Sequence, residues 1–177
     1  VVEREEKGSA VRMLGTHVDI TERKKAEKAI RQSEARFREL ADLLPQVVFE
    51  TDAMGQFTFV NQNALDTFGY TNDDLNMGVN ALQVIAPCDR SRAANRMQQV
   101  MAGEADAGGF EYTAIKKDNT EFPVLIYSTP ILRNGAPSGL RGLLIDVTDR
   151  KKAEAEQEKL QTQLAQAQKM DALGTLS

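Results

Sequence analysis

The sequence predicts an α+β domain: a five-stranded antiparallel sheet with short helices on one face, flanked by amphipathic helices before and after it. Runs rich in β-branched and aromatic residues occur as one pair and one later triplet, with short helical patterns between them. Segments rich in Lys, Glu, Gln and Ala lie on both sides of these runs. The order is therefore helix, two strands, several short helices, three strands and a long helix.

The first helix is expected over residues 21–44, where Ile30, Phe37 and Leu44 recur every seven residues with Leu40 between them. Pro45 ends it. Two arrangements remain open: the apolar stripe packs on its own domain, or it pairs with the same helix of a second chain.

The sheet strands are expected in five runs between turn residues. These runs are 47–52, 57–61, 109–116, 120–132 and 139–147. Short helices separated by Gly69, Gly78 and Pro87 fill residues 62–103, and the last of them runs from about Asp89 to Met101. Pro123 lies inside the fourth run, so it should occupy an edge or a bulge.

The last helix begins near Arg150 and is mostly Gln, Ala and Glu, with Leu160 and Leu164 on one stripe. It has too few apolar residues to form a core, so we expect a partner helix to hold it. A homodimer through the flanking helices is therefore predicted. Its contact residues would be Ile30, Phe37, Leu40, Leu44, Leu160 and Leu164.

A long-range repeat divides the chain. The segment Val18–Glu27 returns with conservative changes as Ile145–Glu154, 127 positions later. In each copy an apolar run ends at Asp-Ile/Val-Thr and a helix-forming stretch comes next, so Thr21 and Thr148 are expected N-caps. We therefore predict the tail of an upstream unit over 1–20, a linking helix over 21–44, a complete domain over 45–148 and an output helix over 149–177.

Composition excludes several classes of protein. The 177 residues carry a formal net charge of −4, which argues against a nucleic-acid partner. The chain has neither a signal-peptide pattern nor an apolar run long enough to insert directly into a membrane, so a cytoplasmic location is expected. Cys88 is the only cysteine, which excludes an internal disulfide. We also expect residue 1 not to be a natural start.

Several strings, together with the order of elements, resemble the PAS domain family over residues 33–152. They are Val60–Ala64, Phe68–Thr71, Val84–Arg90, Lys117–Val124 and Gly142–Arg150. Residues 164–177 are similar to the start of the dimerisation and phosphoacceptor helix of a sensor histidine kinase. The resemblance implies a module of a multi-PAS bacterial kinase in a two-component system, with the kinase domain later in the same chain.

The resemblance also implies how the ends of the domain work. In the family the Asp-Ile/Val-Thr string couples the last strand to an output helix, which assigns this role to Asp146 and Thr148 and, in the first copy, to Asp19 and Thr21. The phosphorylated histidine would lie beyond residue 177. His17, the only histidine, lies on the upstream tail, so by the resemblance it cannot be the phosphoacceptor.

PAS domains hold haem, flavin, small metabolites or nothing. Residues 89–103 contain no axial His, and the Asn-Cys-Arg-Phe-Leu-Gln string of covalent flavin binding is absent, so neither haem nor covalently bound flavin is expected. Flavin bound without a cysteine adduct stays an open alternative. The acidic residues are not at metal-ligand spacing, and no nucleophile has a neighbouring base, so neither a metal site nor catalysis by this chain is expected.

The apolar interior could hold a small ligand, or its side chains could simply fill the core. The candidate lining residues are Phe49, Phe59, Leu65, Phe68, Ile85, Met97, Met101, Phe110, Tyr112, Ile126 and Ser128, with Tyr112 and Ser128 as polar contacts. We expect a sensory module that dimerises and relays a conformational signal to the kinase. The alternatives are a sensor that binds flavin or a small ligand, and a ligand-free dimerisation scaffold.

Overall fold

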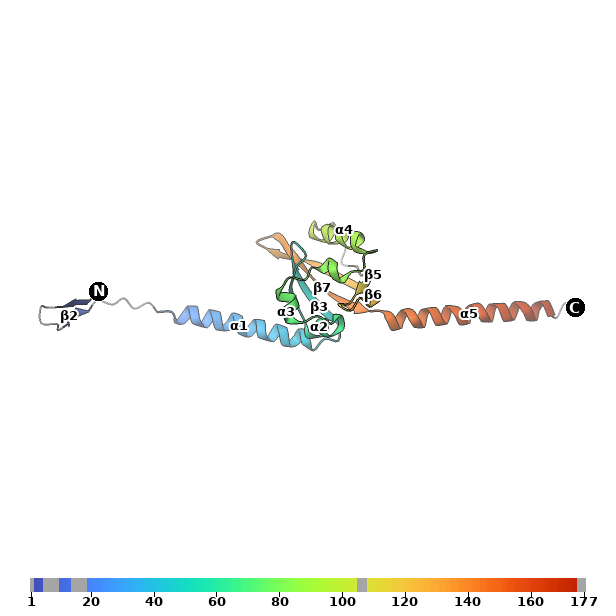
Figure 1. Cartoon of the computed structure of the whole chain (residues 1–177), viewed down its shortest axis with the longest axis horizontal. Helices are drawn as coiled ribbons and strands as arrows, with labels where there is room; N and C mark the ends of the chain where they lie inside the picture. Colours follow the sequence, from blue (N-terminus) through green and yellow to red (C-terminus); the bar gives the residue numbers. More distant parts are fainter. Residues whose placement is uncertain (1, 5–9, 14–18, 105–107, 175–177) are drawn as a thin grey trace. The chain divides into compact units, whose positions relative to one another are not determined.

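The computed structural model describes residues 2–4, 10–13, 19–104 and 108–174, which form two units, Val1–Glu39 and Leu40–Ser177 (Figure 1). In the first unit, β1 (Val2–Arg4) and β2 (Ala10–Met13) form an antiparallel pair. Helix α1 (Thr21–Asp42) begins in this unit and ends in the second.

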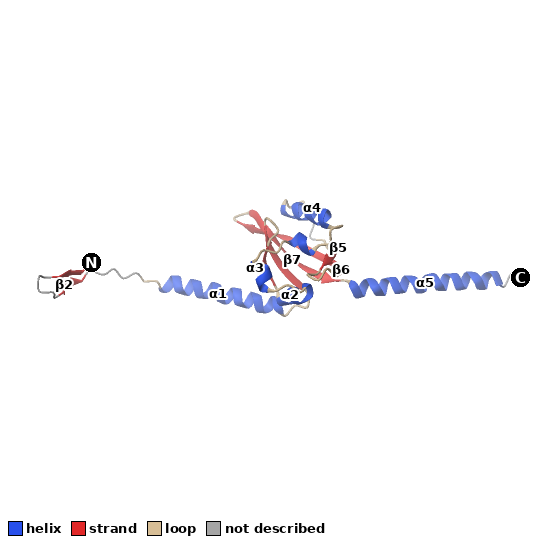
Figure 2. Cartoon of the chain, viewed as in Figure 1, coloured by secondary structure: helices blue, strands red, loops and turns tan. Residues whose placement is uncertain are grey.

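The second unit contains the five-stranded antiparallel sheet that the sequence predicts (Figure 2). Its strand order, which the sequence pattern does not give, is β4-β3-β7-β6-β5. Its strands are β3 (Val47–Asp52), β4 (Phe57–Val60), β5 (Phe110–Ile115), β6 (Glu121–Arg133) and β7 (Ala136–Asp146). The strands β6 and β7 are longer at their shared turn than predicted. Asn134 and Gly135 both adopt positive φ, the conformation of a two-residue hairpin turn, so pairing resumes at once.

Short helices pack on one face of this sheet and complete the core. They are α2 (Gln62–Phe68), α3 (Asn72–Asn76), the 3₁₀ helix η1 (Ala81–Val84) and α4 (Arg90–Met101). The rings of Phe68 on α2 and Phe122 on β6 lie with their centroids 5.4 Å apart. Val124 and Ala114 have no solvent exposure, so the core is centred where β5 and β6 meet the helices.

Pro123 does not lie on an edge strand, because β6 is flanked by both β7 and β5. The prediction of an edge or a bulge was wrong, since the pairing with β5 also runs through Pro123 without a register shift. The register explains why a proline is tolerated. The pairing of β6 with β7 begins only at Val124 and Asp146. Pro123 accepts a hydrogen bond from the N–H of Val147 at 3.1 Å, at the point where the chain leaves the sheet, so no ladder bond between these two strands is lost.

Helix α1 ends at Asp42, two residues before the predicted boundary. Leu44 precedes Pro45, and a residue before proline disfavours the helical conformation. Leu44 is therefore exposed in the loop and does not extend the helical stripe of Ile30, Phe37 and Leu40.

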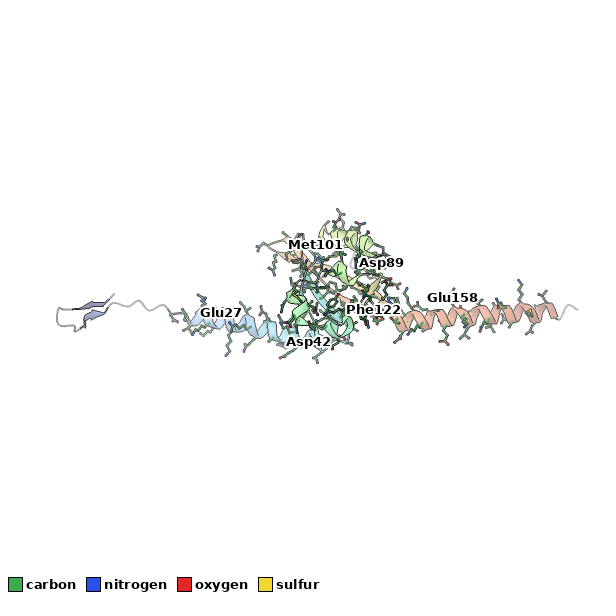
Figure 3. All side chains as sticks on the ribbon, in the orientation of Figure 1. Glu27, Asp42, Asp89, Met101, Phe122 and Glu158 are labelled. Atoms are coloured by element: carbon green, nitrogen blue, oxygen red, sulfur yellow. The ribbon has the colours of Figure 1, made fainter. Side chains whose placement is uncertain are left out.

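A single residue, Val147, separates the end of β7 from the start of helix α5 (Thr148–Gly174). All its described residues except Thr148 are clearly exposed, and Figure 3 shows the side chains around Glu158 extending from the helix, in contrast to the crowded surroundings of Phe122. Within the described residues, no helix combines the length and the apolar character that crossing a bilayer requires.

Candidate functional site

A cavity of about 100 Å³ lies between the sheet and the short helices. Its wall is almost entirely apolar and includes residues from every sheet strand and from all four short helices. It is lined by Val47, Phe49, Thr51, Phe57, Val60, Ala64, Leu65, Phe68, Tyr70, Leu75, Val79, Ala81, Leu82, Val84, Ile85, Ala93, Arg96, Met97, Gly108, Phe110, Tyr112, Ile126, Ser128, Leu140 and Leu144. Pockets for drug-sized ligands start at about 300 Å³, so this cavity suits a smaller molecule.

Nine of the eleven candidate residues from the sequence line the cavity, and Phe59 and Met101 do not. A bulge between Glu50 and Thr51 shifts the register of β3 against β4. Phe57 and Val60 consequently face the cavity, whereas Phe59 lies opposite Glu50 on the other side of the sheet. Met101 is half-buried in the last turn of α4, one turn beyond Met97.

Arg96 is the only charged residue among the described residues that line the cavity, and the sequence pattern did not single it out. Its guanidinium carbon lies 3.7 Å from the centroid of the Phe110 ring. One turn earlier on α4, the guanidinium carbon of Arg92 lies 4.8 Å from the ring centroid of Tyr112. The spacing of four residues, which places two arginines on one helix face, is the signal that could have identified them.

The phenol of Tyr112 is a buried polar group of the cavity wall. Burial raises its pKa, while the positive charges of Arg92 and Arg96 act in the opposite direction. Thr51, which is 2% exposed, has its hydroxyl engaged as acceptor from the N–H of Leu140 at 3.4 Å. The cavity therefore combines an apolar body with a few polar groups contributed by α4, β3, β5 and β6.

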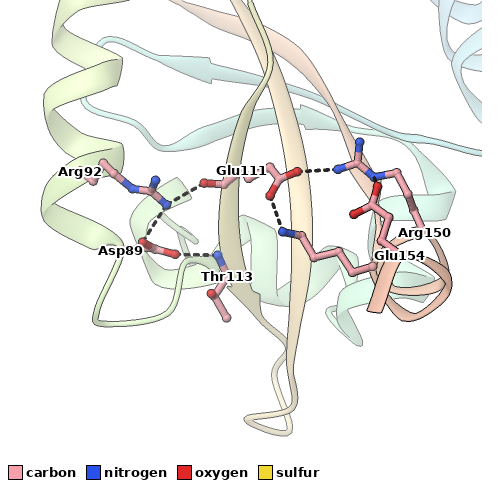
Figure 4. A network of polar contacts seen from close by, with 7 residues as sticks. Asp89, Arg92, Glu111, Thr113, Arg150 and Glu154 are labelled. Carbon is pink, nitrogen blue, oxygen red and sulfur yellow. Dashed lines mark hydrogen bonds and ion pairs between the residues drawn. The ribbon is translucent and has the colours of Figure 1, made fainter. Parts of the chain in front are cut away.

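A polar network continues from α4 across the outer side of β5 (Figure 4). Asp89 accepts hydrogen bonds from the N–H of Thr113 at 2.7 Å and from Nη2 of Arg92 at 2.8 Å. The Thr113 N–H is the main cause that lowers the pKa of Asp89, with the Arg92 charge adding to it. Nη2 of Arg92 also donates to the backbone carbonyl of Glu111 at 2.6 Å, so α4 is fastened to β5 at two points.

The side chain of Glu111 connects β5 to the start of α5. One carboxylate oxygen lies 2.5 Å from Nη2 of Arg150, and the other lies 2.5 Å from Nζ of Lys151. The Lys151 ammonium, followed by the Arg150 guanidinium, holds the pKa of Glu111 below its usual range. Arg150 also lies 3.7 Å from Glu154 one turn along α5 (Figure 4). We call Glu111, Arg150 and Lys151 the clamp; it was not predicted from the sequence because its residues are about 40 positions apart.

The Asp-Ile/Val-Thr joints have the same geometry in both copies of the repeat. Asp146 accepts from the N–H of Thr148 at 2.8 Å, and Asp19 accepts from the N–H of Thr21 at 2.8 Å. Hydrogen bonds from Thr21 lower the pKa of Asp19. The expected N-cap role of the threonines is thus corrected: each threonine is the first helical residue, and the aspartate two positions earlier accepts its N–H.

Other predicted residues stand apart from the cavity. Ile30, Phe37, Leu40, Leu160 and Leu164 are exposed on their helices. His17 lies outside the described residues, which contain no cluster of three or more potential metal-ligating side chains.

Comparison with known proteins agrees with this architecture. The family model described as the PAS fold matches residues 41–152, and this chain belongs to that family. An uncharacterized protein, y4lL of Sinorhizobium fredii, is 30% identical over 96% of this chain, and the sensor protein FixL of Bradyrhizobium diazoefficiens is 25% identical over 98%. This chain spans only 20% and 35% of their respective lengths.

Solved structures show the same fold. A sensory box histidine kinase/response regulator from Burkholderia thailandensis superposes with a TM-score of 0.56 at 19% identity, covering 74% of this chain and 98% of that one.

Proposed function

We propose that the chain is a sensory module of a bacterial sensor histidine kinase and relays the state of its cavity to the kinase through α5. The chain itself catalyses no reaction in this proposal; the kinase domain belongs to the same longer protein and acts in the cytoplasm. Similarity to the sensor protein FixL over 98% of this chain supports the assignment to this class.

The observation that carries the proposal is the double role of β5. Successive side chains of a strand point to opposite faces of the sheet. Phe110 and Tyr112 therefore line the cavity, while Glu111 between them reaches α5 through the clamp. A ligand that displaces β5 would move the clamp and with it the first turn of α5.

The output in this proposal is a rotation or tilt of α5 within a parallel homodimer. The exposed stripes on α1 and α5 support the dimer, because a mostly polar helix is marginally stable without a partner.

An insertion series tests the relay. Residues 1–177 are fused to a histidine kinase catalytic region, and one to seven residues are inserted into α5 after Lys169. Each inserted residue rotates the kinase end of the helix by roughly 100°, so kinase autophosphorylation should vary with the insert and return near its starting value at about seven residues. A rate that is independent of insert length would contradict the proposal.

A small-ligand sensor is favoured over a flavin sensor by the cavity volume of about 100 Å³. An absorption spectrum of the freshly purified protein tests this choice. We expect no band above about 350 nm, where flavin and haem both absorb. A flavin band that survives gel filtration would favour the alternative.

A further inference from the structure

We propose that the cavity binds a small apolar monocarboxylate whose carboxylate is held by Arg96. This inference rests on the proposed sensory function and adds the chemical class of the ligand. It starts from the contrast between an apolar wall and the single charged side chain that the described residues contribute to it.

The charge sits at a defined end of the cavity. Arg96 lies over the ring of Phe110, and Phe110 is paired with Ile126 on β6. Ser128 lies two residues beyond Ile126, on the same face of the sheet, and also lines the cavity. The cavity wall near Phe110 therefore includes one guanidinium, from Arg96, and the hydroxyl of Ser128 on the adjoining part of β6.

The chemistry of these groups selects an anion with a planar acceptor. A guanidinium presents five N–H donors in a fork whose geometry matches a carboxylate. It has no hydrogen-bond acceptor. The apolar surroundings lower the local dielectric and strengthen such a charge-assisted hydrogen bond. The rest of the ligand contacts Phe49, Leu65, Ile126 and other apolar side chains, which favours a hydrocarbon body over a polar one.

Size limits that body. An apolar protein cavity of roughly 150 Å³ accommodates benzene, so about 100 Å³ suits a short branched aliphatic chain. Isovalerate has such a body with one carboxylate, and isovaleramide has the same shape without the charge. The pair therefore separates recognition of the carboxylate from occupancy of the apolar space.

The test is a titration of the isotope-labelled chain with both probes, monitored by amide chemical shifts in NMR. Isovalerate should saturate in the millimolar range and shift the amides of Phe110, Ile126 and Ser128, and isovaleramide should bind about tenfold more weakly or worse. Arg96→Gln should abolish the preference for the acid, and Arg96→Lys should retain part of it. Arg133→Gln removes the same charge from an exposed site and should behave as wild type.

The outcomes distinguish the two proposals. Equal affinity for acid and amide, a preference that survives Arg96→Gln, or no shift at the cavity amides with either probe overturns the carboxylate assignment. Retained amide binding by Arg96→Gln shows that the variant is folded with its cavity intact. The insertion series does not depend on these probes, so a periodic kinase response together with a failed titration would overturn the ligand class and leave the relay in place.

Discussion

At the residue scale, Asn61 holds together the elements next to the cavity. It is 1% exposed, and its Nδ2 donates to the carbonyls of Ala41 and Gln46, each at 2.9 Å. Its Oδ1 accepts from the N–H groups of Val48 at 3.0 Å and Ala64 at 3.2 Å. One amide thus joins the end of α1, β3 and the N-terminus of α2, with its hydrogen-bonding capacity fully used.

Asn61→Ala should be strongly destabilising, because it leaves buried backbone donors and acceptors without partners. Each unsatisfied buried group costs about 1–3 kcal/mol, so we expect a loss of roughly 3 kcal/mol or more in the free energy of unfolding. Urea denaturation measures it. Asn76→Ala, at an exposed position in α3, should change it by less than about 0.5 kcal/mol. An Asn61→Ala protein that matches the Asn76→Ala protein would refute this role.

Single positions differed in how well the sequence could predict them. Most cavity residues were predictable because apolar residues at alternate strand positions face the core. Phe59 failed because a bulge changes the register by one residue, and the pattern of β4 alone does not reveal a bulge formed with β3. Arg96 was missed because a charged residue is normally assigned to the solvent-exposed surface. Only the structure shows that its guanidinium lies over the ring of Phe110.

At the scale of elements, a carboxylate fastens α3 to the turn between β5 and β6. Asp74 accepts from Nζ of Lys117 at 2.7 Å and 2.8 Å and from the N–H of Thr71 at 2.8 Å, as part of a capping box. The Lys117 ammonium is the largest cause that lowers the pKa of Asp74 to about 2, from an ordinary 3.8.

A pH series tests this contact. Because the folded-state pKa of Asp74 is lowered, its stabilising contribution is fully present above its ordinary pKa and is lost as the pH falls through about 2. Asp74→Asn should therefore lower the urea midpoint relative to wild type at pH values above the ordinary pKa, and the difference should shrink as the pH falls toward 2. Asp73→Asn, one residue earlier, serves as the control. A wild-type-to-Asp74→Asn difference that is constant across this pH range would contradict the argument.

The clamp between β5 and α5 predicts a local effect rather than a global one. Glu111→Gln removes the charge that faces Arg150 and Lys151, so the first turns of α5 should open more often. Hydrogen–deuterium exchange of residues 148–155 should become about threefold faster or more, while exchange in β6 stays unchanged. Glu121→Gln removes an exposed charge elsewhere and should leave α5 as in wild type. Unchanged exchange in both variants would mean that the ion pairs do not hold the helix.

Elements were predicted better than the contacts between them. The strands and their sequence along the chain follow from local signals such as the Asn134–Gly135 turn, whereas the spatial order of the strands in the sheet does not. The clamp joins residues of β5 and α5 that no local pattern relates. Pro123 was assigned to an edge or a bulge because proline lacks the N–H that a strand interior requires. Only the register shows that β7 has already ended opposite Pro123.

At the scale of the whole molecule, the repeat extends into the backbone of the first unit. Shifted by 127 positions, β1 (Val2–Arg4) and β2 (Ala10–Met13) correspond to residues 129–131 and 137–140, the ends of β6 and β7 beside their shared turn. Both are antiparallel pairs. The register differs, because Val2 pairs with Met13 while Thr129 pairs with Arg141, one position beyond the equivalent of Met13. The assignment of residues 1–20 to the tail of an upstream unit therefore stays a prediction; each copy of the repeat leads into a helix with the same aspartate joint.

The proposed homodimer can be tested on α5, which has 27 residues and no buried side chain among those described. Leu160 and Leu164 lie on one stripe, and Thr162 and Gln166 lie on the opposite face of the helix. Leu160→Glu combined with Leu164→Glu places charges in the proposed seam, so sedimentation velocity should change from dimer to monomer and far-ultraviolet circular dichroism should lose helical signal.

The matched control adds the same two charges as Thr162→Glu and Gln166→Glu, and it should remain a dimer with full helicity. If the wild type sediments as a monomer at every concentration while α5 stays helical, the helix needs no partner and the parallel dimer is wrong. If both double variants dissociate, the added charge and not the stripe is responsible. Only selective dissociation by the leucine substitutions assigns the seam to the face of α5 that carries Leu160 and Leu164.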